Sequence, residues 1–300
     1  MQALGCVPPL PGYLAAMKAV CDRHGALFMY DEIMCGLGRS GTRHAWQAEG
    51  TPPDIEIVGK TLGSGYASIS AILINEKVIE ALRRGSGCFT HGQTFQNLPV
   101  SCAAALEVQR IIQEDNLVAN VARMGALLSS LLHARFDTHP YVGDIRGRGL
   151  FWCTEFVADR ATKAPFPAAF NLAKRMANRG LEPGYDISLF AANGSADGWL
   201  GDHFLLCPPY NISEGDVEEI VKRVVKVVES VFKDIKREGL LKGMVDSLSE
   251  GEKGEALPNG AGPNDVLTSG GGPDDKLLNG INGISCTGAI ERSQGAPIVA

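Results

Sequence analysis

Length, composition and charge narrow the classes of protein to which this chain can belong. Its 300 residues, 45% of them hydrophobic, suffice for one large domain or two ordinary ones. The net charge of −6, with dispersed arginines and lysines, offers no basic surface for nucleic acid. The cysteines form no C-x-x-C pair, which indicates reduced thiols, and no apolar run reaches the roughly 20 residues that span a bilayer. We therefore expect a cytoplasmic protein with no nucleic-acid partner and no membrane segment.

Helix and strand patterns alternate over the first 84 residues, as in an α/β fold. A helical pattern ends at Gly25, and residues 26–30 are apolar throughout, as in a buried parallel strand. That strand stops at Asp31. Ligands of open α/β sheets bind beyond the carboxyl ends of strands, so Asp31 stands where a functional acid is expected. The alternative is that Asp31 only caps a helix or lies in a loop. Further elements are predicted in chain order: strands over 54–58 and 68–74, and a helix over 76–84 capped by Asn75.

The rest of the chain predicts a second domain and a tail. Two helices over 99–113 and 116–136 lead into a smaller domain over 138–237. Beyond residue 248 the composition changes: the last fifty residues hold eleven glycines and no aromatic residue, so we expect a disordered tail over 248–300. The smaller domain is predicted to contain strand material over 141–157, a helix over 167–179, a strand over 204–207, and a helix over 214–236 with a capping box at Ser213 and Asp216.

One lysine, Lys60, follows an apolar strand and lies among the glycines at 59, 63 and 65. Most lysines are solvated surface charges, but a lysine that small neighbours allow to reach inward is desolvated and reactive. The same residues resemble the end of a phosphate-binding P-loop. That motif requires a glycine where Asp54 stands, and a carboxylate there would repel a phosphate. A nucleotide-binding α/β protein is therefore the lesser alternative.

A second polar, glycine-rich loop spans residues 85–94. Its last residue, Thr94, offers a hydroxyl to an anion, although most loop threonines bond only to local backbone.

Three segments together resemble the class III pyridoxal-phosphate-dependent aminotransferases. They are, in order, MYDEIMCGLGRSG at 29–41, PDIEIVGKTLGSGY at 53–66 and HGQTFQNLPVSCAAAL at 91–106. The resemblance covers residues 12–235. It implies the type I fold: a large α/β domain with a mostly parallel sheet, whose C-terminal portion is residues 1–137 here, and the smaller C-terminal α/β domain at 138–237.

The resemblance also implies residue roles and partners. Lys60 matches the lysine that forms a Schiff base with the aldehyde of pyridoxal phosphate and then moves a proton. Asp31 matches the carboxylate that pairs with the pyridinium nitrogen, and Ile33 matches the residue that packs on the ring. Thr94 matches the threonine that reaches the cofactor phosphate of the other subunit, so a homodimer is implied. The substrates would be a small amino donor and an oxo acceptor.

Departures from the family pattern keep alternatives open. Many members have an arginine for the substrate carboxylate where this chain has Leu205, which cannot bind a carboxylate. Segments for the phosphate loop and the ring-stacking aromatic have no counterpart before Met1, so we expect a shortened chain. A non-catalytic remnant that binds partner subunits is thus the second hypothesis, and mutases, racemases and decarboxylases share the same Lys–Asp pair. No metal site is expected from the spacing of the histidines. Arg146 and Arg148 are predicted to be solvated loop residues, and the alternative is that they meet a carboxylate.

Overall fold

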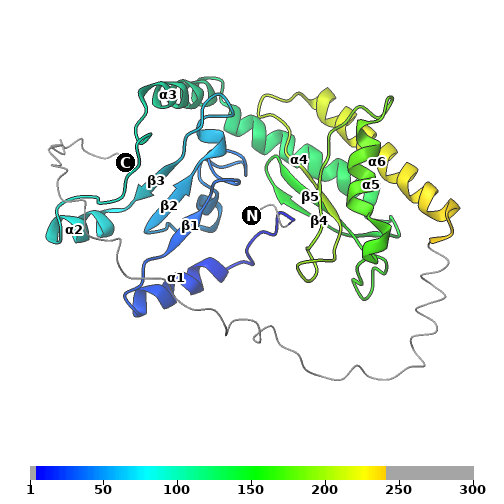
Figure 1. The fold of residues 1–300 in the computed structure, drawn as a ribbon, viewed down its shortest axis with the longest axis horizontal. Helices are drawn as coiled ribbons and strands as arrows, with labels where there is room; N and C mark the ends of the chain where they lie inside the picture. The colour runs from blue at the N-terminus through cyan, green and yellow to red at the C-terminus, as the bar shows by residue number, and fades with distance from the viewer. Residues whose placement is uncertain (1–4, 241–300) are drawn as a thin grey trace, which may run out of the picture. The chain divides into compact units, whose positions relative to one another are not determined.

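The computed structural model describes residues 5–240, in which strands form two separate sheets (Figure 1). One sheet comes from residues 29–74 and the other from residues 142–206. They fall on either side of the domain boundary expected at residue 137, and the boundary itself stays a prediction. The tail expected over 248–300 lies outside the described residues.

The first sheet has the order β1-β2-β3. β1 (Met29–Asp31) runs parallel to β2 (Ile55–Val58), and β3 (Ala71–Ile74) runs antiparallel to β2. This part of the sheet is therefore mixed, whereas a mostly parallel sheet was expected. The parallel pair is the one that positions the candidate site, because parallel strands end at the same edge.

The prediction of a buried strand over 26–30 was wrong. The strand begins three residues later, and the Met29 side chain is 53% exposed. β1 lies at the edge of this sheet in the described residues, and helix α1 (Tyr13–Arg23), which precedes it, has no buried residue. An apolar sequence becomes a buried strand only where other elements cover both of its faces. The strand expected over 68–74 is also shorter than predicted and begins at Ala71.

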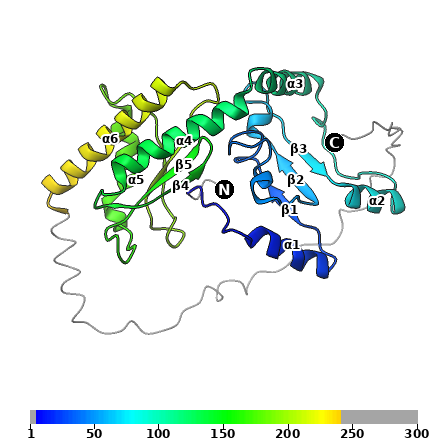
Figure 2. The same cartoon turned by 180° about the vertical axis from the view of Figure 1, so that it is seen from behind.

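Helices α2 (Glu76–Arg84), α3 (Pro99–Glu114) and α4 (Leu117–Phe136) occur where they were expected. Asn75 caps α2, because its side-chain oxygen accepts a hydrogen bond from Val78 N at 3.2 Å. By length and composition α4 could cross a membrane, so the statement that no segment is long enough was wrong. One face of the helix is buried, including Val121, Leu128 and Leu132, and α4 lies beside β4 and β5 in both views (Figures 1 and 2).

The second sheet is antiparallel throughout and has the order β4-β5-β7-β6. Strand β6 was not predicted from the sequence, since three residues are too few to show a period. The strands are β4 (Val142–Arg148), β5 (Phe151–Phe156), β6 (Phe190–Ala192) and β7 (His203–Leu206).

Aromatic rings join this sheet to helix α6 (Glu214–Arg237). The Phe232 ring lies 4.8 Å from Tyr141 and 5.9 Å from Phe156, measured between centroids. The predicted capping box starts the helix: Asp216 N donates to Ser213 Oγ at 3.2 Å, and Ser213 N donates to Asp216 Oδ2 at 3.1 Å.

Helix α5 (Leu172–Leu181) starts later than the 167–179 that the sequence predicted. A short 3₁₀ turn (Ala168–Phe170) comes first, and Asn171, with φ of 49°, separates the turn from the helix. The helix packs against α6 and β6.

Candidate active site

Asp31 and Lys60 lie at the carboxyl ends of two adjacent parallel strands. Asp31 is the last residue of β1 and pairs with Ile57 of β2, while Lys60 begins the 3₁₀ turn η2 (Lys60–Leu62) just beyond β2. Glu32 N donates to Ile57 O at 2.9 Å and extends the pairing by one bond. Both residues therefore lie at the same edge of the sheet, and their roles stay a prediction.

The Asp31 carboxylate is exposed and held on one side. Its Oδ1 accepts a hydrogen bond from Ile33 N at 3.0 Å, and within residues 5–240 no hydrogen bond to Oδ2 is recorded. One oxygen thus fixes the orientation of the carboxylate, and the other can accept a donor from a ligand.

Ile33 packs against the backbone that leads to Lys60. A methyl group built on Gly59 would lie 3.4 Å from Ile33 Cγ2, so the half-buried isoleucine contacts the residue just before the lysine. Ile33 therefore joins Asp31 and Lys60 in one cluster and gives it an apolar side.

Lys60 adopts a left-handed backbone conformation, with φ of 42°. This region costs a residue with a side chain about 1 kcal/mol or more, so the surrounding structure must hold Lys60 in it. The turn closes through hydrogen bonds from Leu62 N to Gly59 O at 2.9 Å and from Ser64 N to Lys60 O at 2.8 Å. The lysine side chain is exposed, so the expectation of a desolvated lysine that reaches inward was wrong, and in the described part of the chain its amine forms no ion pair.

Thr94 is not brought to this cluster. It starts a turn over residues 94–97, its side chain is exposed, and no contact with Asp31 or Lys60 is recorded among the described residues. The structure of one chain therefore assembles three of the four predicted site residues.

A buried polar network behind Asp31 was missed from the sequence. Both oxygens of Glu32 accept backbone N–H groups at 2.7 Å, from Ala45 and Trp46. His44 Nδ1 lies 2.7 Å from Glu56 Oε1, and Trp46 Nε1 donates to Glu56 Oε2 at 3.1 Å. The sequence did contain a sign of this network. Alternation along β2 places the charged Glu56 on the same buried face as Val58, and a buried charge needs polar partners.

This network contains the groups of a possible metal site. The ligand atoms of Glu32, His44 and Glu56 all lie within 4.8 Å of one another, although the spacing of the histidines in the sequence suggested none. Each of the four carboxylate oxygens already has a hydrogen-bonding partner in the protein. Burial is the main cause that raises the pKa of Glu32 to about 7, and the nearby Glu56 carboxylate adds to it. We therefore assign the three residues to a buried hydrogen-bonding network.

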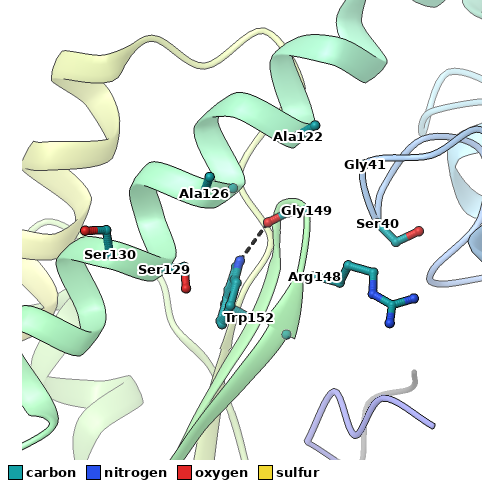
Figure 3. Close-up of a pocket in the computed structure, with 11 residues that line it drawn as sticks. Ser40, Gly41, Ala122, Ala126, Ser129, Ser130, Arg148, Gly149 and Trp152 are labelled. Atoms are coloured by element: carbon teal, nitrogen blue, oxygen red, sulfur yellow. Dashed lines mark hydrogen bonds between the residues drawn. The ribbon is translucent and has the colours of Figure 1, made fainter. Parts of the chain in front are cut away.

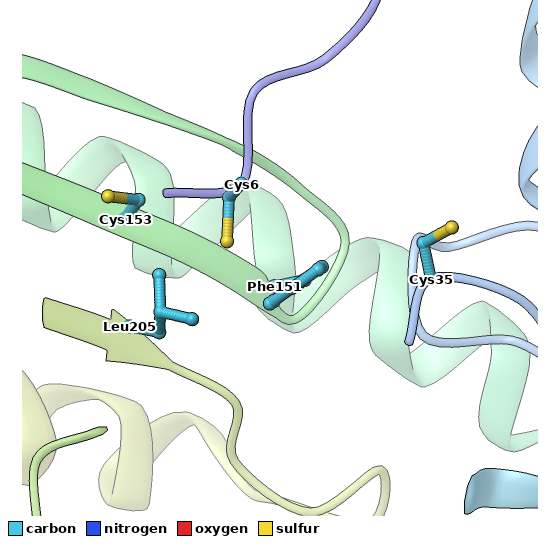
Figure 4. Close-up of a cluster of buried hydrophobic side chains, with 5 residues drawn as sticks. All are labelled: Cys6, Cys35, Phe151, Cys153 and Leu205. Carbon is cyan, nitrogen blue, oxygen red and sulfur yellow. The ribbon is translucent and has the colours of Figure 1, made fainter. Parts of the chain in front are cut away.

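Leu205 and Arg146 belong to the packing of the second sheet. Leu205 is 2% exposed and lies in a buried cluster with Cys6, Cys35, Phe151 and Cys153 (Figure 4). The prediction that Arg146 is solvated was wrong: it pairs with Glu155 and Asp144, and its Nε donates to Gly5 O at 2.6 Å.

Arg148 is likewise a strand residue, and its Nη2 donates to Glu49 Oε1 at 2.8 Å. Both arginines belong to β4, because the β4–β5 pairing extends through them. In the sequence Gly147 and Gly149 interrupt the strand pattern, because glycines are more typical of a loop.

A cavity of about 510 Å³ is separate from the Lys60 cluster. It lies between small residues of α4 and the β4–β5 turn, where Trp152 Nε1 donates to Gly149 O at 2.7 Å (Figure 3). Asp31, Ile33, Lys60 and Thr94 are not among its lining residues, so the chemical groups, rather than this cavity, mark the candidate site.

Comparison with known proteins defines the class. Solved transaminases share the fold: an omega transaminase from Pseudomonas jessenii, solved in complex with PMP, is 37% identical with a TM-score of 0.70, over 79% of this chain and 50% of its own. A transaminase from ancestral reconstruction has a TM-score of 0.72 at 34% identity, over 78% of this chain and 50% of its own. The described residues are thus part of a type I α/β transaminase fold.

The family follows from the sequence match. The model of class III aminotransferases matches residues 2–228, so the chain belongs to this family. An aminotransferase from Gibberella zeae is 51% identical over 75% of this chain and 44% of its own length. A diaminobutyrate–2-oxoglutarate transaminase from Halomonas elongata is 33% identical over 79% of this chain and 50% of its own. The chain spans about half the length of the curated relatives it matches.

Proposed function

We propose that the protein to which this chain corresponds transfers an amino group from an amino acid or amine to a 2-oxo acid or aldehyde, with pyridoxal phosphate as cofactor. The observation that carries the proposal is the cluster of Asp31, Ile33 and Lys60 at the edge where β1 and β2 end. Family membership and the transaminase relatives support it.

The chemistry of these groups fits pyridoxal phosphate. The Lys60 amine would hold the cofactor covalently at its aldehyde carbon. One oxygen of Asp31 is fixed by Ile33 N, and the carboxylate would accept a hydrogen bond from the protonated ring nitrogen. The Ile33 side chain would pack on the ring. When bound, the cofactor supplies a ring that accepts electrons from the substrate.

The protein groups then act on protons and charge. Lys60, once released from the cofactor, would carry a proton away from the substrate α-carbon and return it at the cofactor carbon. Asp31 would keep the ring nitrogen protonated, because an adjacent carboxylate stabilises the positive charge. Leu205 cannot hold a substrate carboxylate, so another group would do so.

We propose further that the protein is a homodimer in which Thr94 binds the cofactor phosphate of the other subunit. The exposed position of Thr94, apart from the Lys60 cluster of its own chain, supports this assignment. PMP, bound in the solved relative, is the aminated form of the proposed cofactor and supports the cofactor assignment.

Capture of the cofactor by Lys60 tests the proposal. The 300-residue chain is incubated with pyridoxal phosphate, reduced with borohydride and analysed by peptide mass spectrometry. We expect the adduct on Lys60 in the unchanged chain, complete loss of it in Lys60→Ala, and retention in Lys222→Ala, which removes an exposed lysine remote in sequence. Absence of a Lys60 adduct in the unchanged chain contradicts the proposal. Donor panels then identify the reaction, since transamination alone leaves the cofactor aminated.

A further inference from the structure

The backbone of the turn after Lys60 is bonded by a side chain from α3. Gln109 Nε2 donates to Thr61 O at 3.2 Å and lies 3.3 Å from Leu62 O. These two carbonyls follow the lysine directly, so the glutamine amide restrains the turn from one side.

A second side chain restrains the same turn from the segment after β7. The Tyr210 hydroxyl donates to Leu37 O at 3.2 Å and lies 3.3 Å from Thr61 Oγ1. Leu37 belongs to the loop after Asp31. The tyrosine therefore links the loops that follow the two chemical residues.

Tyr210 is itself firmly held. Its side chain is 8% exposed, and the Arg39 guanidinium carbon lies 4.5 Å from the centre of its ring. Arg39 Nη1 donates to Pro208 O at 2.6 Å, and Asn120 Nδ2 donates to Tyr210 O at 2.7 Å. The hydroxyl thus extends from a fixed support.

Packing holds only one side of the turn, where the partly buried Leu62 lies against Leu37, Val58 and Ala71. Lys60 is exposed, its φ of 42° is unfavourable, and Tyr66 at the end of the segment is 85% exposed. Without external bonds the backbone would leave the left-handed region, and the amine would spread over several directions.

We propose that Gln109 and Tyr210 are positioning residues that clamp the turn at residues 60–62 and so aim the Lys60 amine. The clamp itself is a property of the fold. Its effect on cofactor capture rests on the function proposed above, and it identifies Tyr210 and Gln109 as residues that set the rate of capture without touching the cofactor.

Hydrogen exchange of the turn amides tests the clamp without cofactor. The variants are Tyr210→Phe, which keeps the ring on Arg39, Gln109→Met, and the double variant. Gln113→Met on the exposed part of α3 and Tyr185→Phe are the matched controls. We expect the Leu62 and Ser64 amides to exchange about threefold to tenfold faster in each single variant and faster still in the double variant. Unchanged exchange in the double variant overturns the proposal.

Reaction with pyridoxal phosphate tests the consequence. The rate of Lys60 adduct formation, per folded chain, is expected to fall about tenfold or more in the double variant, with wild-type rates in both controls. Thr61→Val removes the hydroxyl that contacts Tyr210 and should slow adduct formation as Tyr210→Phe does. Thr61→Ser keeps the hydroxyl and should keep the rate of the unchanged chain.

The two measurements separate the clamp from the proposed function. A merely structural role would lower the folded fraction but leave the rate per folded chain unchanged, and that result overturns the positioning role. If the unchanged chain forms no Lys60 adduct, the proposed function fails, while the exchange experiment still decides whether the clamp exists.

Discussion

Two consecutive carboxylates, Asp31 and Glu32, have opposite environments. Asp31 is exposed at the end of β1, whereas Glu32 is 4% exposed and accepts two backbone N–H groups. Asp31, at the open edge of the sheet, can bind a ligand. Glu32 instead bonds the loop over residues 44–46 to the end of the strand. The sequence singled out Asp31 by its position and gave Glu32 no role.

The buried Glu32 predicts a specific pH dependence of stability. Burial is the main cause that raises the pKa of Glu32 to about 7 in the folded chain, above the ordinary glutamate pKa of 4.5. Between these two pH values the folded chain keeps a proton on Glu32 that the unfolded chain has already released. The free energy of unfolding should therefore fall as pH rises from about 4.5 to 7 and level off above that, by on the order of 2–3 kcal/mol.

Urea unfolding from pH 5 to 8 measures this dependence. Glu32→Gln should remove most of the slope. It should lower stability at pH 5 by about 1–3 kcal/mol, because one backbone N–H loses its acceptor, and this difference should shrink towards pH 8, where the unchanged chain is itself less stable. Glu218→Gln, at an exposed position of α6, is the control and should keep the slope. Equal slopes in Glu32→Gln and the unchanged chain would rule out Glu32 as its source.

At the scale of elements, locally encoded features were predictable and those set by distant partners were not. Helices α2 and α6 begin where Asn75 and Ser213 indicated, because a cap needs only its own first turn. β1 and β3 came out shorter than predicted, since strand limits depend on the neighbouring strands. The same rule holds near the candidate site. The positions of Asp31 and Lys60 at or just after strands were predictable, whereas the network of Glu32, His44 and Glu56 depends on contacts across the fold.

The contact of α4 with the β4–β5 turn predicts an unusual glycine substitution. Gly125 lies so close to Gly149 that an added methyl group would overlap the Gly149 carbonyl. Gly→Ala inside a helix normally stabilises by about 1 kcal/mol. Gly125→Ala should instead destabilise the chain by about 2 kcal/mol, because the hairpin must move away.

Thermal unfolding followed by circular dichroism checks this. Gly215→Ala in α6, where nothing lies within 4 Å of the added methyl group, is the control and should leave the midpoint unchanged or raise it. A Gly125→Ala midpoint at or above that of the unchanged chain would show that α4 and the turn are not in close contact.

At the scale of the whole molecule, the proposed homodimer predicts complementation between inactive chains. α3 exposes Val100 and Leu106, at 75% and 74%, and such apolar side chains favour association. If Thr94 serves the partner's cofactor, a mixed dimer of Lys60→Ala and Thr94→Ala chains has one site with both residues intact.

Cofactor retention after gel filtration is the measurement. Each variant alone should retain little pyridoxal phosphate, and a co-refolded mixture should regain about a quarter of the sites of the unchanged chain, from random pairing of subunits and one intact site per mixed dimer. No gain on mixing would place Thr94 outside the cofactor site of the partner.

The bonds to the Lys60 turn also determine when the lysine can acquire its final conformation. Gln109 lies 48 residues further along the chain than Thr61, and Tyr210 lies 149 residues further. During synthesis from the N-terminus, the turn emerges long before either partner exists, and the longer of the two loops must close before the second bond forms. A nascent chain that ends before residue 210 would therefore present Lys60 in a loosely held turn, so maturation of this lysine is a late event in the synthesis and folding of the chain.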